Sequence, residues 1–187
     1  MPSATPQELA AAIQDCLVAE VRIINLSLAL AYPSTKGEQA LEEALNQCAR
    51  RGVLVVAAAG NQGTLGSSAI TRHPWVIPVA ACNLIGRPIN DSNFGSSIGR
   101  RGLSAPGADI TSLGPTGQAL TLGGTSVAVP FVTGAIALLW SEFLAASAGH
   151  VKFAITQARR PRRASVVPPL LDAALAYNTL SITNAQR

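Results

Sequence analysis

The chain has 187 residues, of which 48% are apolar and 13% charged, and its net charge is +4. Disordered chains combine low hydrophobicity with high charge, so this composition excludes disorder and predicts a large buried core. Three cysteines, Cys16, Cys48 and Cys82, are too few and odd in number for a disulfide scaffold. The length suits one domain covering residues 1–187.

The N-terminal part of the chain has two helix starts on either side of a strand. Thr5 and Glu8 around Pro6 predict a helix that begins with a capping box. Residues 21–28 are rich in β-branched residues and have the length of a strand. Thr35 and Glu38 form a second potential capping box, and Gly52 stands where a helix of this length would end.

The central part of the chain contains apolar runs that read as buried strands. Residues 53–59 are continuously apolar, as expected of a strand covered on both faces in a parallel sheet. A further apolar run spans residues 76–81. Strands separated by helices predict an α/β fold with a parallel sheet between layers of helices. Further helices are expected at residues 126–143, 151–158 and 170–180.

The longest uncharged stretch, residues 110–141, raises the question of a membrane span. It is long enough, since a span takes about 20 residues, but seven Gly, Pro and Gln residues interrupt its first two thirds. A helix buried inside a globular protein fits its last part better, so we expect no membrane partner. The N-terminus lacks the basic and apolar regions of a signal peptide, which favours an intracellular setting without fixing the localisation.

A cluster of four arginines surrounds Pro161. Such a cluster is found in nucleic-acid-binding patches, but no aromatic platform or recognition motif accompanies it here. A solvated loop explains it better, and we expect no nucleic-acid partner. Its members are Arg159, Arg160, Arg162 and Arg163.

Two segments combine reactive side chains with places where α/β proteins bind ligands. Ligands bind outside the carboxyl ends of parallel strands, and Gly60 and Asn61 directly follow the run 53–59. Ser126 stands at the head of the apolar helix, among unpaired N–H groups that suit a developing oxyanion. A turn at Gly60 and a simple helix cap at Ser126 are the plainer interpretations of the same residues.

Several motifs together resemble the subtilisin-type serine peptidases, or subtilases. They occur in the family's order from about residue 5 to residue 180. The stronger motifs are Ile23-Ile24-Asn25-Leu26-Ser27-Leu28, residues 55–61 ending in Gly60-Asn61, Ala105-Pro106-Gly107, and Gly124-Thr125-Ser126 with the following residues 127–130. Residues 74–81 and Ser92-Asn93-Phe94-Gly95 match the intervening segments.

The resemblance implies a role for each of these segments. Ser126 would be the nucleophile that forms an acyl-enzyme. Asn61 and the Ser126 backbone N–H would donate hydrogen bonds to the oxyanion. Residues that would bind the substrate are Ser27, Leu28 and Ala29, which would pair with its backbone, Ala58, Ala59 and Gly60, which would form the opposite wall of the main specificity pocket, and Thr125.

The triad's general base and its Asp partner have no counterpart in this sequence. In subtilases both precede the matched region, so we expect the C-terminal part of a catalytic domain, with the N-terminal strands of a three-layer subtilisin-like fold missing. His73 lies at a position where the family has no catalytic residue, and His150 lies beyond the apolar helix, about 30 Å from Ser126 at a rise of 1.5 Å per residue. Without a base, a serine hydroxyl is a weak nucleophile, and the chain alone is expected to be nearly inactive.

The expected partners follow from the missing general base and its Asp partner. The substrate would be a peptide or protein, with no cofactor and no metal site. A second chain could supply the Asp and His, or cover an exposed sheet edge at the 21–28 strand, and a homo-oligomer could cover the same edge. The alternative is a catalytically dead subtilase-fold protein that binds peptides or acts as a scaffold.

Overall fold

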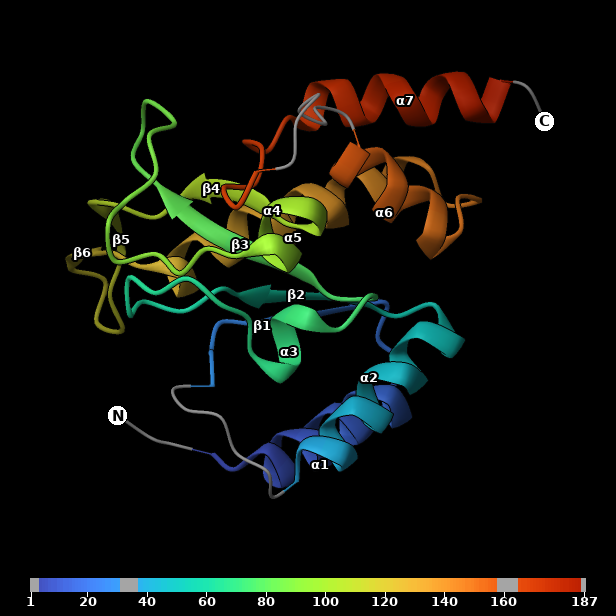
Figure 1. Ribbon diagram of the computed structural model, residues 1–187. Coiled ribbons are helices and arrows are strands. Elements are labelled where there is room, and N and C mark those ends of the chain that lie inside the picture. The colour runs from blue at the N-terminus through green and yellow to red at the C-terminus, as the bar shows by residue number, and fades with distance from the viewer. Residues whose placement is uncertain (1–3, 31–36, 158–164, 186–187) are drawn as a thin grey trace.

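A computed structural model describes residues 4–30, 37–157 and 165–185, and its centre is a four-stranded parallel sheet. Figure 1 shows the strands in the order β1-β2-β3-β4. The expected parallel α/β architecture is confirmed. The strands are β1 (Ile23–Leu26), β2 (Leu54–Ala58), β3 (Ile77–Cys82) and β4 (Leu103–Pro106).

The two central strands are buried along their whole length. Every residue of β2 and β3 is buried, which accounts for their uninterrupted apolar sequences. Strand β1 is shorter than the predicted 21–28, since pairing with β2 runs only from Ile23 to Leu26. Strand β4 escaped prediction because a polar residue and a proline stand among its four residues.

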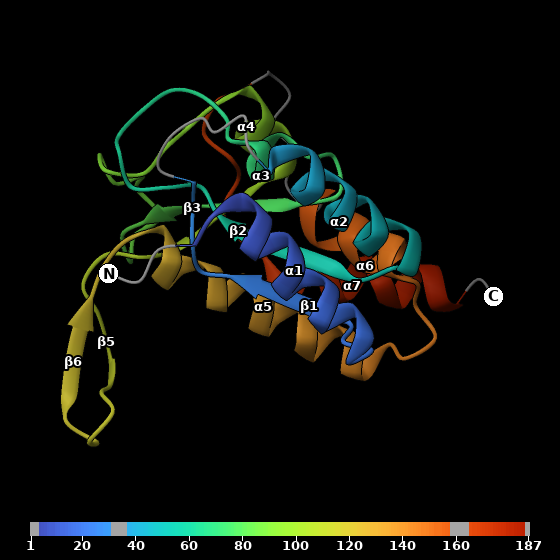
Figure 2. The same ribbon diagram turned by 90° about the horizontal axis from the view of Figure 1, so that it is seen from below.

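Helices cover both faces of the sheet, as Figures 1 and 2 show. Helices α1 (Pro6–Val18) and α2 (Glu38–Arg51) pack on one face, and α5 (Thr125–Glu142) crosses the other with α6 (Ala148–Gln157) and α7 (Ala173–Ala185) beside it. Two apolar cores result, one on each face. Short helices α3 (Ala69–Arg72) and α4 (Ser96–Arg101) lie in the connections around β3.

Helix ends show which capping predictions hold. Thr5 caps α1 through the Glu8 N–H, and the Glu8 carboxylate accepts from the Thr5 N–H, so this capping box is confirmed. The second capping box is wrong. Gly37 caps α2 without a side-chain bond, while Thr35 lies outside the described residues. Gly52 ends α2 in the left-handed conformation, as predicted.

Helix α5 is less buried than its sequence suggests. The expectation of a buried helix holds only for the face of α5 that meets the sheet. On its other face Phe131 is 43% exposed and Leu138 is 74% exposed. By length and composition α5 could also cross a membrane, although 39% of it is buried inside the protein. An apolar groove runs between this face and α7.

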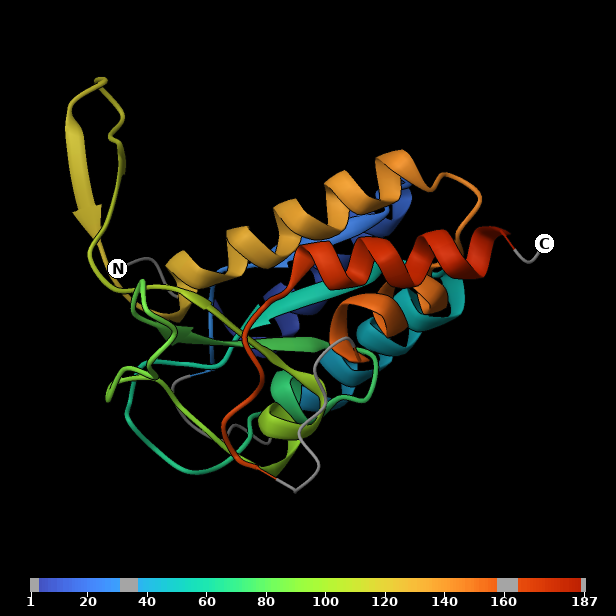
Figure 3. The ribbon, with the colours of Figure 1, turned by 90° about the horizontal axis from the view of Figure 1, so that it is seen from above.

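The strand pair β5 (Ile110–Leu113) and β6 (Ala119–Leu122) forms a hairpin that projects from the body of the protein. Figures 2 and 3 show it extending from the N-terminal end of α5, on the side where β1 forms the sheet edge. Among the described residues, β1 pairs with β2 alone. The predicted open edge is therefore present. The arginine cluster at 159–163 lies outside the described residues.

Candidate active site

The segment after β2 and the head of α5 meet through the side chain of Asn61. Its Oδ1 accepts a hydrogen bond from the Thr125 N–H at 2.8 Å and another from the Thr125 hydroxyl at 2.9 Å. These bonds use the oxygen end of the amide. Among the described residues nothing accepts a hydrogen bond from the Asn61 Nδ2, and the side chain is exposed to solvent. A free, oriented N–H donor thus stands beside the start of α5.

Thr125 links the two segments from the inside. It is 1% exposed, and its hydroxyl also accepts from the Gly60 N–H at 3.2 Å. The sequence placed Thr125 with the substrate-binding residues, whereas in this structure its polar atoms face Asn61 and Gly60. The backbone before it is equally constrained. Gly124 has φ +114°, and a Cβ there would lie 2.9 Å from the Asn61 Nδ2.

Ser126 occupies the second position of α5 and is half-buried. Its hydroxyl has no hydrogen-bond partner in the part of the chain that the structure describes. Its N–H has no carbonyl partner within the helix, as expected in the first turn. Hydroxyl and N–H therefore both remain available at the positive end of the helix dipole.

A chain of polar side chains ties the end of β1 to the Ser126 peptide. Ser27 Oγ donates to the Ser126 carbonyl at 2.9 Å, and Asn25 Nδ2 donates to Ser27 Oγ at 2.8 Å. Thr133 of α5 donates in turn to Asn25 Oδ1 at 2.9 Å. The bond between Thr133 and Asn25 could not be predicted, because it joins residues 108 positions apart in the sequence.

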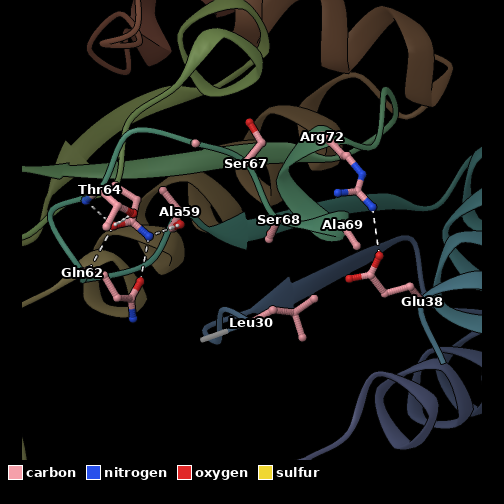
Figure 4. Close-up of a pocket in the computed structure, with 11 residues that line it drawn as sticks. Leu30, Glu38, Ala59, Gln62, Thr64, Ser67, Ser68, Ala69 and Arg72 are labelled. Atoms are coloured by element: carbon pink, nitrogen blue, oxygen red, sulfur yellow. Dashed lines mark hydrogen bonds and ion pairs between the residues drawn. The ribbon is translucent and has the colours of Figure 1, made fainter. Parts of the chain in front are cut away.

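A cavity of about 210 Å³ opens next to the Asn61 segment. In Figure 4, Ala59, Gln62 and Thr64 lie at one end of it, and the ion pair of Arg72 with Glu38 at the other. Small side chains of α3 and the preceding loop, Ser67, Ser68 and Ala69, line the space between.

The residues expected to form the two walls of a specificity pocket are only partly gathered at this cavity. Ala59 lines it, whereas Ala58 is 2% exposed and packs in the core beneath α5. Leu28 is 38% exposed and Ala29 is half-buried. Leu30, which follows Ala29 in the chain, also lines the cavity.

Neither histidine contacts Ser126. His73 is buried between α2 and β3, where its Nε2 bonds to Asn46 Oδ1 at 3.2 Å and its Nδ1 accepts from the Trp75 N–H at 3.3 Å. Burial lowers the pKa of His73. His150 lies in α6, where its Nδ1 pairs with the Ser147 hydroxyl. Both contacts suit structural roles.

Among the described residues, no group of three or more His, Cys, Asp or Glu side chains could hold a metal ion. The groups described at the site are the Ser126 hydroxyl, the N–H donors of Asn61 and Ser126, and further backbone groups. Such a set can stabilise the oxyanion of an acyl transfer to Ser126.

Comparisons with known proteins find subtilases and other proteases. The model of the subtilase family matches residues 1–177. A thermostable alkaline protease of Halalkalibacterium halodurans is 35% identical over 137 residues, which are 73% of this chain and 36% of that protein. Subtilisin DY of Bacillus licheniformis is 34% identical over 131 residues, 70% of this chain and 46% of its own length. The chain thus spans less than half the length of these relatives.

The comparison of structures agrees with the comparison of sequences. A mutant of the protease domain of PatA superposes with a TM-score of 0.89 at 31% identity, covering 97% of this chain and 68% of that one. Nearly all of the present fold is therefore matched, and about a third of the other chain has no counterpart here.

Proposed function

The chain belongs to the subtilase family, and from this premise we propose that it carries the nucleophile and the oxyanion-binding part of a serine endopeptidase. The observation that carries the proposal is the fixed orientation of Asn61. Its oxygen is bound by Thr125, and its N–H donor is left free next to Gly124, at the start of the helix that carries Ser126. A residue that only closed a turn would not need both.

In the proposed reaction Ser126 Oγ attacks the scissile carbonyl carbon while a general base takes the hydroxyl proton. The carbonyl oxygen becomes an oxyanion that accepts hydrogen bonds from the Asn61 Nδ2 and the Ser126 N–H. Collapse of this intermediate breaks the C–N bond, and the amine leaves with the proton. The acyl ester on Ser126 is then hydrolysed by water through the same steps.

The base and its acidic partner would come from polypeptide other than these 187 residues. Neither histidine contacts Ser126. We infer that this polypeptide docks on what we call the open face, which consists of the free edge of β1 and the β5–β6 hairpin. Both lie on one side of the molecule (Figures 2 and 3). The exposed apolar side chains of the hairpin are Leu113, Leu120 and Leu122.

Docking on this face is consistent with two physical requirements. An unpaired parallel strand offers its N–H and C=O groups to a further strand. A two-stranded hairpin is also marginally stable in water unless something packs against it. The occupant would therefore cover β1 and the hairpin together, and it would bring its base to the side of Ser27 and Ser126.

The acyl-transfer proposal is tested with an activated ester and an external base. We expect p-nitrophenyl acetate to acetylate Ser126 slowly, and added imidazole to accelerate the reaction. Asn61→Ala should slow it by about 10²–10³-fold, the usual effect of losing an oxyanion donor. The adduct is located by peptide mass spectrometry, with Ser126→Ala as the blank. Acetylation at the same rate in Asn61→Ala would contradict the proposed role of Asn61.

The open face is tested by light scattering. Without an occupant, the isolated chain should self-associate reversibly as its concentration rises. Leu113→Glu should keep it monomeric, and Leu84→Glu, at a loop position of similar exposure, should not. A chain that stays monomeric at millimolar concentration would argue against an apolar docking face.

The second candidate is a catalytically dead protein that binds peptides. The lack of any hydrogen-bond partner for the Ser126 hydroxyl among the described residues favours it. It predicts that a peptide binds beside Ser27 while Ser126 stays unmodified in every assembly of the protein.

A further inference from the structure

Asn93 lies in the connection between β3 and α4, and its side chain is half-buried beside the segment that carries Asn61. We propose that Asn93 is a positioning residue, which holds the backbone on both sides of Asn61 and so aims the oxyanion donor. This inference rests on the proposed function of Asn61. No catalytic contact is assigned to Asn93 itself.

The side chain of Asn93 uses both ends of its amide. Its Oδ1 accepts from the N–H groups of Gln62 and Thr64, each at 3.0 Å, and from the Thr64 hydroxyl at 3.1 Å. Its Nδ2 donates to the Ala59 carbonyl at 3.2 Å and to Gln62 Oε1 at 2.7 Å. Figure 4 shows Ala59, Gln62 and Thr64 gathered around these bonds. The five bonds reach the chain before and after Asn61.

The backbone of Asn93 adds a sixth bond to the same segment. Its N–H donates to the Gly60 carbonyl at 2.9 Å. Gly60 has φ +108°, and a Cβ there would lie 2.3 Å from the Asn93 Nδ2. Asn93 therefore packs directly against the residue before Asn61, and only glycine allows this approach.

Thr125 and Asn93 constrain Asn61 in complementary ways. Thr125 binds the side-chain oxygen of Asn61 and the N–H of Gly60. Asn93 binds the carbonyl of Gly60 and, after Asn61, the N–H groups of Gln62 and Thr64. An amide donor must be held to within about 0.5 Å to serve a transition state. The bonds of Thr125 do not reach the backbone after Asn61, and the contacts of Asn93 with Gln62 and Thr64 restrain that part.

The amide of asparagine matches this position chemically. A carboxylate of the same shape would keep the three bonds to Oδ1 but lose the two bonds from Nδ2. An alanine would lose all five. Asn93→Ala should therefore have a larger effect than Asn93→Asp. Asn90, an exposed residue of the same connection, provides a matched control.

The test is an NMR comparison of the wild-type chain with Asn93→Ala, Asn93→Asp and Asn90→Ala. In Asn93→Ala we expect the side-chain NH₂ signals of Asn61 to move to the positions of a freely rotating asparagine. The amides of Gln62 and Thr64 should exchange about ten- to a hundredfold faster. Asn93→Asp should give smaller changes, and Asn90→Ala none. If Asn93→Ala does not fold, the shift of the Asn61 signals in Asn93→Asp decides.

Unchanged Asn61 side-chain signals, with faster exchange at Gln62 and Thr64, would overturn the proposal, since Asn93 would then only close the loop. A failure of the proposed function would be seen elsewhere. In that case the wild-type Ser126 would not be acetylated, and the NMR result would be unaffected.

Discussion

Replacing Thr125 with valine removes one hydroxyl from the centre of the site and keeps the shape of the side chain. That hydroxyl donates to Asn61 Oδ1 and accepts from the Gly60 N–H. Gly60 and Thr125 are both buried, so water cannot replace the lost acceptor. An unsatisfied buried donor costs about 1–3 kcal/mol. We therefore expect Thr125→Val to lower the free energy of unfolding by about that amount.

The measurement is urea denaturation followed by circular dichroism, with an unchanged m-value as evidence that only stability has changed. Thr125→Ser is the matched control. It keeps the hydroxyl and loses one buried methyl group, which costs about 1 kcal/mol. Hydrogen exchange of the Gly60 amide separates the two variants, because protection should be lost in Thr125→Val and retained in Thr125→Ser. Equal protection of Gly60 in both would refute the reasoning.

Three further changes test other parts of the structure. Gly124→Ala should lower the free energy of unfolding by about 1–3 kcal/mol, because φ is +114° there. Gly134→Ala should instead stabilise α5 by about 0.5–1 kcal/mol, because an added Cβ meets nothing within 4 Å. Thermal unfolding that ranks the two variants the other way would be inconsistent with this backbone. Lys152→Met should lower stability by about 1–2 kcal/mol in urea, since the Lys152 ammonium donates to two carbonyls before β3 at 2.7 and 2.8 Å; an unchanged midpoint would show that these bonds contribute nothing. Burial holds the pKa of His73 below 6.5. The unfolded chain therefore binds the proton first as the pH falls, and the free energy of unfolding should decrease from pH 6.5 downward. His73→Gln should reduce this decrease, and an identical pH dependence of stability in the variant would exclude His73 as its source.

The fold could be predicted where burial dictates the sequence. Strands β2 and β3 are apolar at nearly every position because both faces are covered, and the Thr5 capping box marks the start of α1 through local bonds. Strand β4 and the β5–β6 hairpin were missed, because they are four residues long and lie in a stretch rich in glycine and threonine. The exposure of α5 depends on what packs against it, which its own composition does not record.

The places of Asn61 and Ser126 in the fold could be predicted because they follow from chain position. Asn61 comes at the carboxyl end of a parallel strand, and Ser126 at the start of a helix. Their supports could not be predicted, because they depend on which distant segments meet. The Asn93 side chain bonds to Gln62 across 31 residues, and Thr133 bonds to Asn25 across 108. The Ser92-Asn93-Phe94-Gly95 motif was visible in the sequence, but it carried no indication of which groups Asn93 would bind.

The central claim is that these 187 residues hold the nucleophile and the oxyanion donor but not the base. The most direct measurement is the rate at which a fluorophosphonate labels Ser126 in the isolated chain, followed by intact mass and located by peptide mapping. The account predicts labelling close to that of an ordinary serine hydroxyl. Rapid, stoichiometric labelling of Ser126 without any added base or second polypeptide would contradict it.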